Sequence, residues 1–186
     1  MTFTVLLDAN VLVPVSLADT LLRAAEQGLY TPLWSERVLV EVRRAILKVH
    51  PDIAAGRLDA RIHAMNRAFE DALVVGWESL EAGLTLPDQD DRHVVAAAIR
   101  GKADVIVTSN LKDFPPKALE LLGLEALSPD DFLQDLLDLA PEAMTAVIWS
   151  QAAATAHPPL TVSGVLTSLR QAGAPIFADQ MEALVG

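Results

Sequence analysis

The sequence predicts an α/β fold in which helices cover both faces of a parallel sheet, followed by a small all-α extension. Short apolar segments alternate with segments of helical periodicity up to about residue 127. These apolar segments are continuous rather than alternately polar, which is typical of parallel strands buried on both faces. From residue 129 only helical periodicity continues. We therefore expect two parts, at 1–128 and 129–186.

The first half of the chain begins with a strand. Residues 3–7 are apolar and partly β-branched and end at Asp8, which indicates a buried strand. Ser35 is a favourable N-cap for a helix that Pro51 closes. Pro32 indicates that its strand lies at an edge or is a loop. In order, we expect a strand at 3–7, a helix at 19–27, a strand at 30–34, helices at 35–49 and 57–71, and a strand at 72–76.

The second half continues this alternation and then becomes helical. Gly101 is expected to end a helix that starts at Asp90 or Asp91. Ser128 is followed by proline and two acids, which is typical of a helix N-terminus. We also expect a strand at 103–108, a shorter element at 120–127, a linker or turn at 156–159 and a helix at 161–172.

The composition restricts the class of protein. The absence of cysteine excludes disulfides, zinc–thiolate sites and thiol nucleophiles. No apolar run is long enough to span a bilayer, and the N-terminus lacks the pattern of a signal peptide, so we expect a soluble, cytoplasmic protein without membrane contact. The net charge of −11 disfavours non-specific binding of nucleic acid. That objection weakens if the acids gather at a cation site and the basic residues gather elsewhere.

Two acids stand out in the first half. Asp8 ends an apolar strand, where a carboxylate costs desolvation energy unless something compensates it. The alternative is a helix-capping or turn aspartate. Glu41 flanks the apolar stripe of its expected helix, and its alternative is a surface salt bridge to Arg44 or Lys48.

Two further acids stand out in the second half. Asp91 shares a helix face with small apolar residues, and this face should be buried. Acids are also common in a first helical turn, which is the ordinary explanation for Asp88 and Asp90 and accounts less well for Asp91. Asp113 follows a strand end by a few residues and could be an ordinary loop aspartate, with Asn110 as a nearer neutral oxygen ligand. His93 is expected at the surface or behind the site, because no second histidine lies at ligand spacing.

Together the four acids indicate a cation site. Functional residues of such sheets collect at the carboxyl ends of the strands, and carboxylates gathered there repel one another unless a cation is present. Oxygen ligands without sulfur or imidazole suit Mg²⁺ or Mn²⁺. Such ions activate water for attack at phosphorus, so no protein nucleophile is needed. The sequence has no glycine-rich phosphate loop.

The sequence resembles PIN domains, and among them the VapC-like toxins. Four stretches carry the resemblance, in order: residues 6–12, 35–44, 88–98 and 105–114. The resemblance implies a three-layer α/β/α sandwich, an acidic quartet that holds one or two Mg²⁺ or Mn²⁺ ions, and endoribonuclease activity. The helical extension at 129–186 is similar to the C-terminal extension of one subgroup of these toxins.

The resemblance assigns roles residue by residue. Asp8, Glu41 and Asp91 match the first three acids of the family, and the fourth is either Asp113, which we favour, or the position of Asn110. The expected supporting residues, which would orient a carboxylate or a water, are Asn10, Thr108, Ser109 and Asn110. Ser35 could act in the same way or simply cap its helix.

The resulting hypothesis is a metal-dependent ribonuclease that leaves 3′-hydroxyl and 5′-phosphate ends and is held silent by a small antitoxin protein; a homodimer is plausible. The expected RNA-contacting charges are Arg37, Arg43, Arg44 and Lys48, although for each single residue an ordinary solvated helix face is the favoured explanation. The main alternative is a catalytically silent binding or scaffold protein on the same fold. A phosphotransferase with Asp8 as nucleophile is disfavoured, because the expected second aspartate and Gly-Thr are missing.

Overall fold

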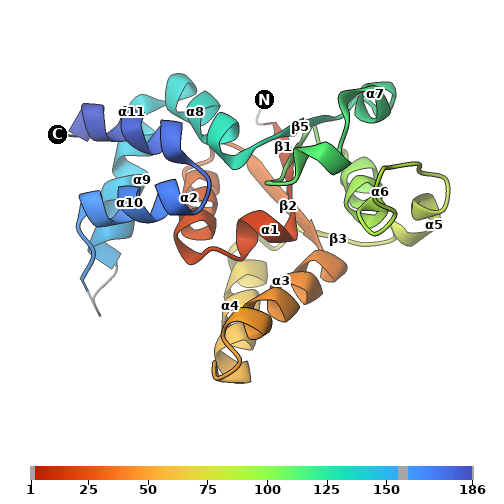
Figure 1. The fold of residues 1–186 in the computed structure, drawn as a ribbon, viewed down its shortest axis with the longest axis horizontal. Coiled ribbons are helices and arrows are strands. Elements are labelled where there is room, and N and C mark those ends of the chain that lie inside the picture. The colour runs from red at the N-terminus through yellow and green to blue at the C-terminus, as the bar shows by residue number, and fades with distance from the viewer. Residues whose placement is uncertain (1–2, 155–158, 186) are drawn as a thin grey trace.

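The core of the protein is a five-stranded parallel sheet, seen in a computed structural model that describes residues 3–154 and 159–185. The strand order is β3-β2-β1-β4-β5, so the first strand lies in the middle (Figure 1). Leu6 of β1 is in register with Leu33 of β2 on one side and Ile106 of β4 on the other. The strands are β1 (Thr4–Leu7), β2 (Thr31–Ser35), β3 (Leu73–Val74), β4 (Val105–Val107) and β5 (Glu125–Leu127).

Helices cover both faces of this sheet and confirm the predicted α/β/α architecture. On one face, α6 packs over Leu6, Leu33 and Ile106. On the other face, Val5 and Leu7 pack against α2 and its neighbours. The helices are α1 (Ala9–Leu12), α2 (Val15–Glu26), α3 (Glu36–Val49), α4 (Ala55–Ala68), α5 (Glu78–Glu81), α6 (Arg92–Gly101), α7 (Pro116–Leu119), α8 (Pro129–Leu139), α9 (Pro141–Ala154), α10 (Val162–Gln171) and α11 (Pro175–Val185), with 3₁₀ turns η1 (Leu111–Asp113) and η2 (Glu120–Leu122).

The predicted edge position of β2 is wrong for the strand as a whole, because β2 lies between β1 and β3. Pro32 is nevertheless tolerated for the expected reason. The two residues of β3 pair only with Trp34 and Ser35, so the side of β2 that faces β3 has no strand partner at Pro32. A proline nitrogen, which cannot donate, is therefore accommodated there.

The predicted end of α6 at Gly101 is confirmed, and the glycine also has a packing role that was not predicted. The left-handed residue that follows α6 is Lys102, with φ 55°, and not the glycine. A Cβ atom on Gly101 would lie 2.5 Å from Leu33 Cδ1 and 2.9 Å from Val74 Cγ2. The glycine thus allows the end of α6 to approach the sheet closely, and this approach fixes the helix that begins beside Asp91.

The helical extension packs onto α2 rather than standing apart (Figure 1). Phe132, Met144 and Phe177 belong to the same apolar core as Val5 of β1. A buried polar contact crosses the junction: Thr20 Oγ1 donates to Gln151 Oε1 at 2.6 Å, and Gln151 Nε2 donates to the carbonyl of Ser16 at 2.9 Å. The core therefore continues across residue 128.

The remaining expectations concern single segments. The expected helix at 161–172 is confirmed as α10, which Thr161 caps. The short helix α1 directly after Asp8 was not expected. Residues 156–158 of the expected linker lie outside the described residues. Within the described residues, none of the helices is both long and apolar enough for a bilayer crossing.

Candidate active site

Asp8 lies at the carboxyl end of the central strand and is 5% exposed. Its Oδ1 accepts a hydrogen bond from the backbone N–H of Ala9 at 2.7 Å. Asp8 therefore caps α1, as the helix-capping alternative predicted. Its Oδ2 accepts from Asn10 Nδ2 at 2.7 Å and from Thr108 Oγ1 at 2.8 Å. Capping and a functional role are compatible, because each carboxylate oxygen can accept more than one bond.

The supporting residues Asn10 and Thr108 form a small network around Asp8. Asn10 Nδ2 also donates to Thr108 Oγ1 at 3.0 Å, and Asn10 Oδ1 accepts from the Ser109 N–H at 2.9 Å. Thr108 Oγ1 further accepts from the Asn110 N–H at 3.1 Å. These bonds join the ends of β1 and β4, so they fix the position of the Asp8 carboxylate. Ser109 contributes through its backbone here.

Burial raises the pKa of Asp8 above its ordinary value, and the hydrogen bonds from Thr108 and Ala9 partly oppose this rise. The nearby charge of Glu41 raises the pKa further, and His93 lowers it. Asp8 is thus a buried carboxylate whose ionised form is held mainly by hydrogen bonds rather than by a paired cation.

Asp91 lies immediately before α6, and the face behind it is buried as predicted: Val94, Val95 and Ala98 are fully buried. Its side chain makes no capping hydrogen bond, although it is the N-cap residue of α6. Within the described residues, its buried Oδ2 has no hydrogen-bond partner. Burial raises the pKa of Asp91 to about 6, with contributions from the negative charges of Asp8, Asp88 and Asp113.

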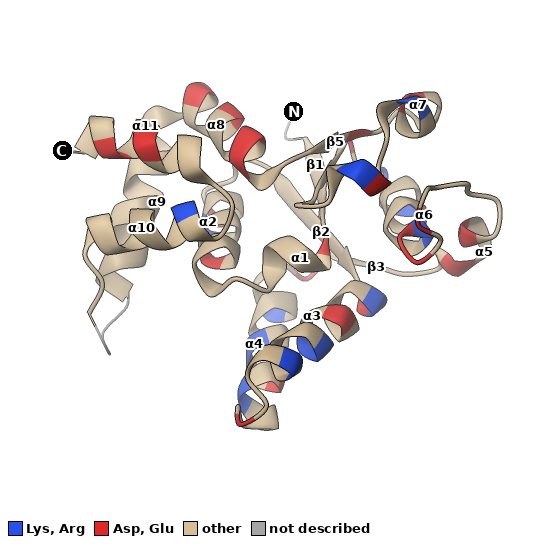
Figure 2. Ribbon diagram, in the orientation of Figure 1, with Lys and Arg blue, Asp and Glu red and all other residues tan. Residues whose placement is uncertain are grey.

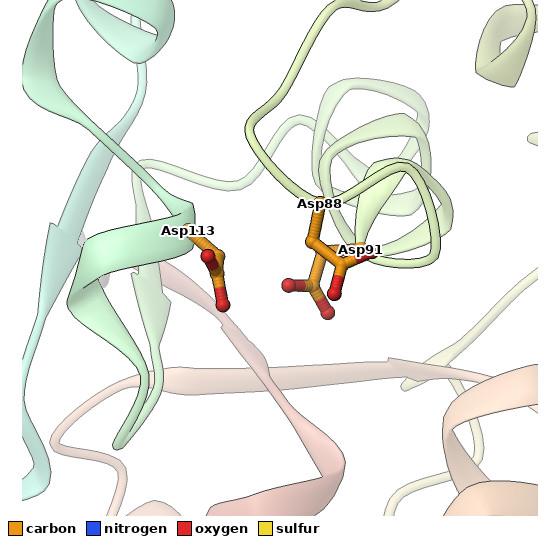
Figure 3. Close-up of side chains that lie close together, drawn as sticks. All are labelled: Asp88, Asp91 and Asp113. Atoms are coloured by element: carbon orange, nitrogen blue, oxygen red, sulfur yellow. The ribbon is translucent and has the colours of Figure 1, made fainter.

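The structure brings Asp91 and Asp113 together with Asp88 (Figure 3). One carboxylate oxygen from each of the three residues lies within 4.8 Å of the other two. In Figure 3, Asp88 and Asp91 lie side by side at the start of α6, and the Asp113 carboxylate faces them from η1. Asp88 was interpreted from sequence as an ordinary first-turn acid. Its spacing of three residues from Asp91 was the signal available for including it.

Asn110 and Asp113, the two candidates for the fourth position, are in direct contact. Asn110 Nδ2 donates a short hydrogen bond to Asp113 Oδ2. The asparagine thus orients the carboxylate, and the carboxylate is the member of the acidic cluster. Both residues belong to one local unit at the end of β4.

Glu41 reaches the site from α3 but is not one of the three clustered acids. Its Oε1 lies 3.0 Å from His93 Nε2 and 3.7 Å from Arg37 Nε. The expected salt bridge to Arg44 or Lys48 is not among the ion pairs of the described residues. Of the two positions expected for His93, the surface is excluded because the ring is 1% exposed, and the contact with Glu41 fits the position behind the site. Ser35 Oγ accepts from the Val38 N–H at 3.2 Å and acts as a helix cap.

Half of the basic residues lie on α3 and α4, and the others are spread over further helices, including α6, α7 and α10 (Figure 2). Arg37 forms an ion pair with Glu81 at 3.0 Å, and Arg43 pairs with Asp59. Arg44 and Lys48 are exposed and form no ion pair among the described residues. The expected segregation of basic residues from the acids is therefore only partial.

The comparisons with known proteins agree with this geometry. The family model described as PIN domain matches residues 4–112. The chain belongs to the PIN-domain family. A second family model, described as VapC50 C-terminal domain, matches residues 129–183, which include α8 to α11. The predicted resemblance to PIN domains and VapC-like proteins is confirmed.

One curated relative shares much of this PIN-family chain. It is the Mycobacterium tuberculosis protein named "Putative ribonuclease VapC50", and it is 44% identical over 113 residues. The match covers 61% of this chain and 66% of the relative, so it spans just under two thirds of that protein's length. No solved structure gave a significant match.

Proposed function

We propose that this chain is a metal-dependent endoribonuclease that hydrolyses RNA phosphodiester bonds, and that it is the toxin of a toxin–antitoxin pair. The observation that carries the proposal is the group formed by Asp88, Asp91 and Asp113, with Asp8 in electrostatic contact with Asp91. Carboxylates at this separation repel one another, and the buried Asp91 Oδ2 lacks a partner in the described residues. A divalent cation would remove both penalties.

The donor set fits Mg²⁺ or Mn²⁺. All the candidate ligands are carboxylate oxygens, which these ions prefer; the sequence has no cysteine, and no histidine belongs to the group among the described residues. We propose Asp8, Asp91 and Asp113 as the principal ligands, with Glu41 completing the site and Asp88 as an added candidate. When bound, such an ion supplies activation of water and charge neutralisation at phosphorus.

The protein's own residues would hold the site ready for this chemistry. Asn10 and Thr108 fix Asp8, and Asn110 fixes Asp113. In the reaction, the oxygen of water bonds to phosphorus and the bond from phosphorus to the 3′-oxygen breaks. The products are a 3′-hydroxyl and a 5′-phosphate. Arg44 and Lys48, the two free basic side chains described above, are suited to contact the RNA backbone.

The proposed antitoxin partner has a suitable surface. A groove of about 690 Å³ lies between the start of α2, the end of α3 and α4. Its lining includes the exposed Val15 and Val49, the basic residues Arg57 and Arg61, and one acid, Asp52. An apolar segment that carries acidic residues fits this combination. Val49→Asp should release a co-purifying short partner, whereas the exposed Val75→Asp, on a loop outside the groove, should not.

Cleavage of a labelled RNA pool tests the proposed activity. Wild-type protein should cut RNA with Mg²⁺ or Mn²⁺, stop in EDTA and leave 5′-phosphate ends. Asp8→Asn and Asp91→Asn should each abolish cleavage, and Asp90→Asn should retain it, because Asp90 is exposed and outside the acidic cluster. Cleavage that survives both site variants would contradict the proposal and favour a contaminating nuclease on a silent PIN fold.

A further inference from the structure

His93 is a polar side chain buried within an otherwise apolar helix face. It lies on α6 two residues after Asp91, is 1% exposed, and is followed by the fully buried Val94 and Val95. Its ring lies against Trp77, with ring centroids 5.9 Å apart. Within the described residues, its buried Nδ1 has no hydrogen-bond partner. A leucine would fill this position without leaving a buried polar atom unpaired.

The other ring nitrogen makes the contact that explains the histidine. His93 Nε2 lies 3.0 Å from Glu41 Oε1. An ionised carboxylate can only accept, so His93 Nε2 is the donor side of this close nitrogen–oxygen contact. The contact joins α6, which begins beside Asp91, to α3, which carries Glu41. Glu41 and His93 are far apart in the sequence, and this contact brings their side chains together.

A second basic side chain lies near the same oxygen of Glu41. Arg37 Nε lies 3.7 Å from Oε1, and Arg37 itself is held by Glu81 of α5 at 3.0 Å. No hydrogen bond to Glu41 Oε2 is found among the described residues. Glu41 also acts electrostatically on Asp8, so its carboxylate lies on the side of the acidic group. The contacts thus hold one oxygen and leave the other available there.

We infer that His93 is a positioning residue: it holds Glu41 Oε1 so that Oε2 serves the metal site. This inference rests on the proposed function. Glutamate has a long side chain that is 33% exposed here, and it would otherwise sample several rotamers. Hydrogen bonds from behind a ligand fix its orientation and raise its affinity for metal, and their loss typically weakens metal binding by about 10-fold or more.

Two polar substitutions provide a matched test. The amide nitrogen of glutamine can take the place of imidazole Nε2, whereas the shorter asparagine cannot reach Glu41. We expect His93→Asn to weaken Mn²⁺ binding by about 10-fold in calorimetric titration. His93→Gln should stay close to wild type. Thermal unfolding in EDTA should show that both variants are folded, which separates positioning from general stability.

A double-mutant cycle with Glu41→Gln shows whether His93 acts through Glu41. If it does, His93→Asn should cause little further loss of Mn²⁺ affinity in the Glu41→Gln background. Equal losses in both backgrounds, or an unchanged affinity of the single variant, would overturn the inference. If wild type binds no Mn²⁺, or if Asp91→Asn binds Mn²⁺ as tightly as wild type, the proposed metal site is wrong and the inference about His93 is wrong with it.

Discussion

Replacing Asp91 by asparagine should stabilise the metal-free protein at neutral pH. The pKa of Asp91 rises from its ordinary 3.8 to about 6, because of burial and of repulsion by Asp8, Asp88 and Asp113. The folded protein therefore retains a proton that the unfolded chain releases between about pH 4 and pH 6. The free energy of unfolding of the metal-free protein falls as the pH rises from about 4 to about 6, and the full loss is present above that range.

The structure gives the size of this effect. A rise from 3.8 to about 6 corresponds to about 3 kcal/mol at full weight. Asp91 is only partly buried, so screening by solvent reduces the cost, and we expect about 1 kcal/mol. Asparagine keeps the shape and removes the charge.

Urea unfolding in EDTA at pH 4 and pH 7.5 measures this difference. Asp91→Asn should match wild type at pH 4 and exceed it at pH 7.5, whereas Asp90→Asn should track wild type at both. With Mn²⁺ at pH 7.5 the order should reverse, because only wild type gains the full binding energy. A variant that is no more stable than wild type in EDTA at pH 7.5 would refute the reasoning about repulsion.

Three other changes have defined outcomes. Thr108→Val should lower the free energy of unfolding by about 1–3 kcal/mol at pH 7.5 and shift Mn²⁺ binding to higher pH. The reason is that Asp8 loses a buried hydrogen bond that favours its ionised form. Ser109→Ala keeps the backbone bond to Asn10 and should cause neither change. Gln151→Leu should cost about 1–3 kcal/mol in urea unfolding, because the Ser16 carbonyl loses its donor Gln151 Nε2 and the Thr20 hydroxyl is left with that carbonyl alone. Removal of residues 129–186 should leave a chain that binds a hydrophobic dye and lacks a cooperative transition, since the core crosses this boundary; a cooperative melt would show that the first part folds alone.

The sheet and the first acids could be predicted because local signals determine them. Continuous apolar runs fix the central strands, and the carboxyl end of a central strand places Asp8 without knowledge of the partners. Asp91 could be placed because its helix has a clear small-residue face. These predictions depend on periodicity over a few residues, which the chain displays directly.

Features that depend on distant contacts could not be predicted. Asp88 looks like any first-turn acid until Asp113 is brought against it from η1. The burial of His93 follows from the packing of α6 between the sheet and Trp77, and no sequence interval encodes it. Glycine commonly ends a helix, but the small size of Gly101 also allows α6 to approach Leu33 and Val74 closely. The shared core of the extension likewise follows from docking rather than from local pattern.

The central claim is that the carboxylates at the end of the sheet hold a divalent cation. Anomalous diffraction from crystals grown with Mn²⁺ tests this most directly, with Asp91→Asn crystals as the control. The account predicts a Mn²⁺ peak bonded to Asp91, within reach of Asp8 and Asp113, that disappears in the variant. A wild-type crystal with no peak there, or an equal peak in the Asp91→Asn crystal, would contradict it.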